Sequence, residues 1–243
     1  MFYLMLFPST GLKAQVNETT VFQTEIGLRG RWQTGNLNQL GLIPSAQLLV
    51  EASKFSISIN SSYQYLKVDG FNPVNDFWNF ALFKANPKHT LHPILAANIG
   101  FARSYKINKS YTIGIGMGYN LRNKSSKDFV EMGVIAGYMD LEYENEKPHK
   151  SASFGLLLST SFPIGENLHI SNNLKTYHSS KDHTFWGGSN QIMLHYQLKE
   201  NLSLNISQDL VFNNQNAGGI EKLNTLMLFG LQYRYTKNLN RSK

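Results

Sequence analysis

The segment from His178 to His183 brings together the residue types that a serine hydrolase needs. It reads HSSKDH, with a hydroxyl nucleophile, an imidazole base and a carboxylate in Asp182. Such an enzyme requires these groups in mutual hydrogen-bond contact, together with a donor for the oxyanion. The segment offers no identifiable oxyanion donor, and polar surface loops are built from the same residues. We therefore expect no enzyme and no catalytic residue, and keep hydrolysis of lipid or peptide in loop 178–183 as the alternative.

Metal and nucleotide chemistry have weaker support. A metal ion at His178, Asp182 and His183 lacks a further ligand. The glycines of GIGMG, residues 114–118, are not followed by the helix pattern that a phosphate-binding turn requires. The chain has no cysteine, which excludes disulfides and cysteine-based zinc sites. We expect no metal and no cofactor.

A second set of charged residues lies at alternate positions of a strand pattern. Glu25, Arg29 and Arg31 share one face of FQTEIGLRGRW, and apolar residues occupy the other, because successive strand side chains point to opposite faces. Glu131 and Asp209 hold equivalent polar positions later in the chain. In a closed sheet these residues would line the lumen, where opposed charges either select solutes or pair and fill the space. Both outcomes remain open, with a slight preference for a filled lumen. Further candidates for this face are Glu51, Arg122, Lys175 and Arg234.

The same alternation recurs along most of the chain and defines the elements that would position these charges. In residues 55–65, for example, aromatic and branched residues alternate with serine, asparagine and glutamine. A face of serine and asparagine does not suit a soluble core, but it suits a water-filled barrel lumen. Segment 168–176 fits least well, because Asn172 falls on its apolar face. Residues 69–75 are expected to be a loop from their Gly, Asn and Pro content.

These patterns predict an all-β fold: a transmembrane, antiparallel, up-and-down β-barrel of roughly twelve strands over residues 16–243. A closed barrel pairs every backbone N–H and C=O inside lipid, and tyrosines and tryptophans near the strand ends would lie at the two membrane interfaces. A soluble secreted β-sandwich is disfavoured, because polar faces opposite apolar ones recur along nearly the whole chain.

The N-terminus and the charge distribution bear on location. Residues 1–15 contain a short apolar run followed by small and polar residues, which is typical of the end of a signal peptide whose basic part is missing here. The alternative is a buried first strand. The formal charge of +7 is scattered, so no nucleic-acid partner is expected. We expect a monomer in the cell outer membrane, with outer-membrane lipid and the barrel insertion machinery as partners.

Several segments resemble the bacterial outer-membrane family DUF481, which includes so-called salt-induced outer membrane proteins. They are GRWQTGNLN (30–38), GIGMGYNLR (114–122), FPIGENLHISNNL (162–174), LKENLSLNISQDL (198–210) and GLQYRY (230–235). The resemblance implies an outer-membrane barrel without established activity or catalytic residues. It departs from such barrels in one respect, because residues 236–243 follow the aromatic Tyr235. The expected function is a structural envelope protein or a narrow passive channel.

Overall fold

The computed structural model describes residues 19–33, 39–68, 71–125, 128–214 and 223–240. The chain forms strands joined by short connections, with one 3-10 helix, η1 (Arg103–Tyr105). The strands are β1 (Thr19–Gln33), β2 (Gln39–Glu51), β3 (Phe55–Val68), β4 (Phe71–Ala85), β5 (Leu91–Ala102), β6 (Ile107–Ser125), β7 (Asp128–Tyr143), β8 (His149–Pro163), β9 (Leu168–Ser179), β10 (Trp186–Lys199), β11 (Leu202–Asn213) and β12 (Leu223–Asn240). No helix of the described residues is long and apolar enough to span a membrane.

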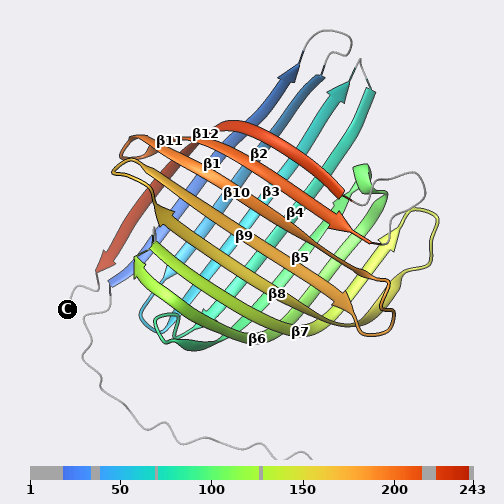
Figure 1. Cartoon of the computed structure of the whole chain (residues 1–243), viewed down its shortest axis with the longest axis horizontal. Helices are drawn as coiled ribbons and strands as arrows, with labels where there is room; N and C mark the ends of the chain where they lie inside the picture. The colour runs from blue at the N-terminus through green and yellow to red at the C-terminus, as the bar shows by residue number, and fades with distance from the viewer. Residues whose placement is uncertain (1–18, 34–38, 69–70, 126–127, 215–222, 241–243) are drawn as a thin grey trace, which may run out of the picture.

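The strands close into a single barrel in which each strand pairs with its neighbours in the sequence (Figure 1). The barrel closes where β1 pairs antiparallel with β12, from Thr19 opposite Asn240 to Gly30 opposite Phe229. The prediction of an all-β, up-and-down barrel of about twelve strands is therefore confirmed. We call the end that carries Thr19 and Asn240 the turn end, and the opposite end the loop end.

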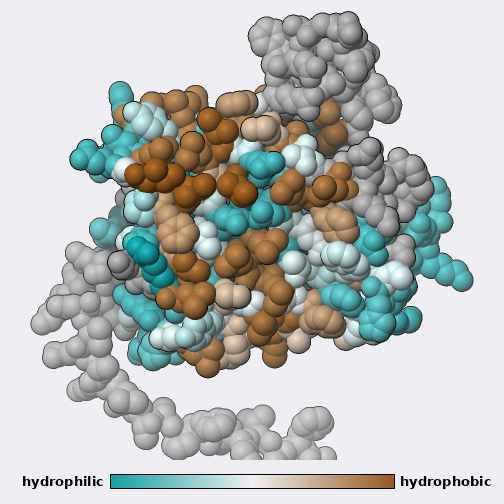
Figure 2. All heavy atoms as spheres, in the orientation of Figure 1, coloured by the Kyte–Doolittle hydropathy of each residue, from teal (hydrophilic) through white to brown (hydrophobic). Residues whose placement is uncertain are grey.

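The barrel is apolar outside and polar inside along β1. Ile26 is 67% exposed and Leu28 is 53% exposed, whereas Glu25 and Arg29 are 6% and 7% exposed. A soluble β-protein would bury the first pair and expose the second. Figure 2 shows the outer wall dominated by hydrophobic residues. This distribution fits a wall that faces lipid.

Exposed aromatic residues lie toward both ends of this wall. Tyr63, Tyr138 and Trp186 lie toward the loop end, and Tyr196 and Tyr233 lie toward the turn end. The side chain of Trp32, which the sequence also placed in an interfacial belt, lies outside the described residues. Two aromatic levels of this kind are typical of a membrane barrel.

One local prediction was wrong. Residues 69–75 are mostly strand, because β4 begins at Phe71 and Val74 pairs with Leu66. The β3–β4 hairpin extends beyond the barrel body in Figure 1, where Pro73 does not interrupt a central strand. The last strand continues past Tyr235 to Asn240, because its residues pair with the start of β1. The residues Thr34, Gly35 and Asn36, a combination that favours a tight turn, lie outside the described residues.

The glycines of β6 create room inside the barrel. A Cβ on Gly118 would lie 2.4 Å from Nε2 of His92, whose side chain fills that space. A Cβ on Gly116 would lie 1.8 Å from the carbonyl oxygen of Val134 on the neighbouring strand. Such separations are too short for any side chain, so these positions require glycine for close approach.

Candidate functional site

One ionic cluster spans β1, β11 and β12 on the inner wall. Glu25 lies opposite Arg234 in the β1–β12 register, and the Arg234 guanidinium and the Gln232 amide both donate to its carboxylate. Arg29 Nη1 donates to Ser207 Oγ at 2.8 Å and lies 3.3 Å from Asp209 Oδ2. The structure therefore brings together four residues that the sequence had assigned to the lumen, namely Glu25, Arg29, Asp209 and Arg234.

A second cluster lies on β4, β5 and β7. The ammonium of Lys84 donates to the carboxylate of Glu131, and Nε2 of His92 lies 3.4 Å from its other oxygen. Glu131 was singled out from the sequence, whereas Lys84 and His92 were not. Residues 77–85 are apolar on both faces, so the alternation could not show which way Lys84 points. The glycine at position 118 was the feature of the sequence that could have indicated an inward-facing His92, because the His92 side chain fills the space that Gly118 leaves.

The remaining predicted lumen residues take different places. Arg122 does not join the lumen clusters: it pairs with Asp128 at 2.6 Å and lies 5.8 Å from the ring centre of Phe162, at the turn end. A register shift next to Arg122 in the β6–β7 pairing changes the alternation there. Glu51 is half-buried near the same end. The side chain of Arg31 lies outside the described residues.

Lys175 reaches across the barrel interior. Its Nζ lies 3.6 Å from the ring centre of Phe80, which is close enough for a cation–π interaction. Lys175 belongs to β9 and Phe80 to β4, and four strands separate the two along the shorter path around the barrel. Figure 1 shows β4 and β9 in opposite walls. This contact therefore crosses the lumen and narrows it.

An apolar cluster fills part of the interior at the loop end. Ala102, Met139 and Leu141 are buried at its centre together with Ile107 and Tyr143. The half-buried residues that pack against them are Trp78, Tyr105, Tyr177 and Phe185. Burial, with a smaller contribution from the charge of Asp76, raises the pKa of Tyr105 in η1 to about 12, so its hydroxyl stays protonated at neutral pH.

Asn213 connects this cluster to the far wall. Its Nδ2 donates to the Tyr143 hydroxyl at 2.6 Å, and its Oδ1 accepts from the Tyr177 hydroxyl at 3.1 Å. These bonds join β7, β9 and β11 inside the loop end. One side of the interior is consequently packed like a protein core.

Polar side chains on the inner face of the neighbouring strands remain accessible. Asn173 and Ser189 point inward, because they alternate with outward-facing residues on β9 and β10, yet both are exposed. Ser58, Asn60 and Ser62 on β3 are half-buried. A space that solvent can reach therefore lies beside the packed side.

The hydrolase-like residues form a buried cluster at the loop end. Ser179 Oγ lies 2.9 Å from both His149 Nε2 and Ser151 Oγ, and it accepts the N–H groups of Lys181 at 3.2 Å and Asp182 at 3.3 Å. His178 instead faces outward and stacks on Phe154 with ring centres 4.7 Å apart. Because Ser179 is 0% exposed and its oxygen is engaged as an acceptor, the cluster holds the loop in place rather than presenting a nucleophile.

The carboxylate of Asp182 belongs to this loop. Hydrogen bonds from the hydroxyl and the N–H of Thr184 hold the pKa of Asp182 below its usual value, and it remains charged at neutral pH. Among the described residues, no group of three or more His, Cys, Asp or Glu side chains is arranged to hold a metal ion.

Ser179→Ala is expected to make loop 180–185 open more often. The substitution removes the hydrogen-bond partner of His149 and leaves two backbone N–H groups without their acceptor, at a cost of about 1 kcal/mol, or about fivefold in the opening equilibrium of the loop. The rate of trypsin cleavage after Lys181 measures this opening. The control is Ser180→Ala, which removes one exposed hydrogen bond to the carbonyl of Ala152. Equal cleavage rates in the two variants would contradict the holding role of Ser179.

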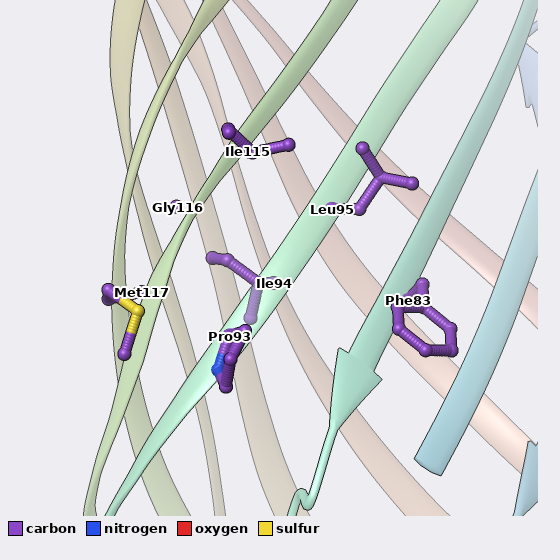
Figure 3. Close-up of a pocket in the computed structure, with 7 residues that line it drawn as sticks. All are labelled: Phe83, Pro93, Ile94, Leu95, Ile115, Gly116 and Met117. Atoms are coloured by element: carbon purple, nitrogen blue, oxygen red, sulfur yellow. The ribbon is translucent and has the colours of Figure 1, made fainter. Parts of the chain in front are cut away.

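A shallow apolar groove lies on the outer wall over β4, β5 and β6 (Figure 3). Its outward-facing residues include Phe83, Leu95, Ile115 and Met117. Gly116 of β6 also lines the groove. It is separate from the lumen, and its chemistry suits contact with acyl chains.

Comparisons with known proteins agree with this architecture. The model of a family described as "Protein of unknown function, DUF481" matches residues 25–235. No curated protein matches. A solved structure of the NanC porin is similar with a TM-score of 0.51 and 11% identity, covering 88% of this chain and 99% of that one. The COG4313 outer membrane channel from Pseudomonas putida F1 has a TM-score of 0.48 and 10% identity, covering 96% of this chain and 100% of that one.

Proposed function

The chain belongs to the family described as protein of unknown function, DUF481, and from that premise we propose that it is a narrow passive channel of the outer membrane. The observation that carries the proposal is the interior itself. Paired charges line β1, β11 and β12, and Asn173 and Ser189 face inward yet stay exposed. Fixed opposite charges beside an accessible space set a transverse field that discriminates among small solutes.

The outer-membrane location has its own support. The apolar exposed wall, the closed sheet without an edge and the two aromatic levels are the features that lipid requires of a spanning β-protein. Export by a signal peptide in residues 1–15, contact with outer-membrane lipid and insertion by the barrel machinery belong to the same proposal.

A purely structural envelope role is the second candidate. It is favoured by the contact between Lys175 and Phe80 and by the apolar cluster at the loop end, because both occupy lumen space. The two roles differ in one measurable property, which is whether ions pass through the folded and inserted protein.

Single-channel recording in a planar bilayer tests the proposal. The wild type is expected to give small, stepwise currents. Glu25→Ala leaves the Arg234 charge without its carboxylate partner and should shift the reversal potential toward anion preference. Arg29→Ala leaves Asp209 without that cation and should shift it toward cation preference.

Leu28→Ala is the matched control, because Leu28 lies between these two positions in β1 and faces outward. It should leave conductance and selectivity unchanged. Silence from a wild-type protein that shows the heat-modifiable mobility of a folded barrel would refute the channel and favour the structural role.

A further inference from the structure

A patch of polar side chains lies on the outer wall, where lipid contact requires apolar ones. Thr160, Asn172, Asn190 and Gln208 belong to four consecutive strands, β8 to β11, and all point outward. The patch surrounds Ile192, which lies opposite Asn172 on β9 and opposite Gln208 on β11. We call these four residues the amide patch.

The position of the patch follows from the pairing register. Thr160 lies directly opposite Asn172, and Asn190 lies two residues from Ile192 along β10. The four side chains therefore form one contiguous surface rather than scattered exceptions. In Figure 2 hydrophilic residues interrupt the hydrophobic wall over the strands that Figure 1 shows at the front, β8 to β11.

The patch has unmet hydrogen-bonding capacity. Oδ1 of Asn172 and Oδ1 of Asn190 are buried against the wall, and neither has a hydrogen-bond partner within the described part of the chain. Hydrocarbon offers no donor, so an amide left in this state in a bilayer costs free energy. The chain itself covers both oxygens, so each carboxamide must turn about its terminal bond before a partner outside this chain can satisfy it.

The same barrel shows how an outward amide is satisfied internally. Asn79 on β4 also points outward, and its Nδ2 donates to Ser61 Oγ on β3 at 2.7 Å. The outward Thr176 hydroxyl accepts the N–H of Leu156 at 2.9 Å. The orphaned amides of Asn172 and Asn190 are thus particular to the amide patch and not a general property of the wall.

We propose that the amide patch is the contact surface between two copies of this chain in the membrane. This inference rests on the membrane placement that we propose above, and it replaces the monomer expected from the sequence. A carboxamide carries both donors and acceptors and can turn about its terminal bond, so two identical patches related by a two-fold axis can pair amide with amide. Interhelical amide pairs stabilise association in lipid by the same chemistry.

Cysteine cross-linking tests the contact directly, because the chain has no cysteine of its own. Ile192→Cys places a thiol at the centre of the patch, close to the two-fold axis, and mild oxidation in native membranes should give a covalent dimer. Phe83→Cys is the matched control, since β4 lies halfway around the barrel from β10. Equal cross-linking of the two variants, or none in either, would overturn the proposal.

Removing the amides provides the second test. Asn172→Leu with Asn190→Leu should convert the dimer in mild detergent to a monomer, measured by light scattering, whereas Asn79→Leu should leave the dimer intact. Heat-modifiable mobility confirms that each variant is folded, and bilayer currents report channel function separately. A folded wild type that is monomeric in mild detergent, together with an Ile192→Cys variant that stays monomeric after oxidation in membranes, refutes the dimer, whatever the conductance. A silent dimer refutes only the channel.

Discussion

Phe80→Ala is expected to raise the single-channel conductance by about twofold or more, because a pore conducts through its narrowest section. The ring of Phe80 meets Lys175 Nζ at 3.6 Å across the interior. Alanine removes the ring and releases the lysine, whose ammonium lies over this ring. Planar bilayer recording at fixed salt measures the change.

Phe83→Ala is the control for Phe80→Ala. Phe83 lies on the same strand but faces outward, so its loss changes the wall and leaves the lumen as it was. Conductance of Phe80→Ala equal to that of the wild type, with insertion preserved, would mean that the contact with Lys175 does not form the constriction.

Glu131→Leu is expected to destabilise the barrel by about 3 kcal/mol, because it leaves two basic side chains inside the protein without their carboxylate partner. The Lys84 and Glu131 side chains are only 20% and 14% exposed, and the His92 side chain is 0% exposed. With the carboxylate gone, Lys84 loses its counter-ion and His92 loses the carboxylate oxygen that lies 3.4 Å from its Nε2. The midpoint of unfolding in urea, followed by loss of the heat-modifiable form, measures the effect.

The double variant Lys84→Met with Glu131→Leu supplies the control for this prediction. Replacing both members of a buried ion pair with apolar groups is often close to neutral, so most of the lost stability should return. A double variant as unstable as the sum of the two single variants would show that the pair does not couple, and that Glu131 acts through packing alone.

The outward and inward faces of this barrel are readable from the sequence because strand alternation is local. A register slip by one residue would turn every apolar side chain inward, so the order of residues in β1 is enough to separate Ile26 from Glu25. The direction of Lys84 could not be predicted in this way, since residues 77–85 (FWNFALFKA) are apolar on both faces. The structure explains that composition, because the inward Trp78 packs against the apolar cluster of the interior.

The partners of inward charges could not be read in the same way. Arg29 meets Asp209 across the intervening strand β12, and their contact depends on how the sheet closes. Ser179 meets His149 across the β8–β9 pair, whereas the sequence pointed to the adjacent His178 and His183. Composition also failed at residues 69–75, because glycine and proline mark a loop only where no neighbouring strand extends the hairpin.

The pairing of β1 with β12 dictates the order in which the molecule can be assembled. Every other pair joins strands that follow one another in the chain, so those hairpins can form locally before the two ends of the chain meet. Thr19 and Asn240 meet only when the last strand has been delivered to the first. Until then both strands present unpaired N–H and C=O groups, which attract other chains in water and are costly in lipid. Closure is therefore the late, committing step of folding. An assembly factor would help most by covering the edges of β1 and β12 until they pair.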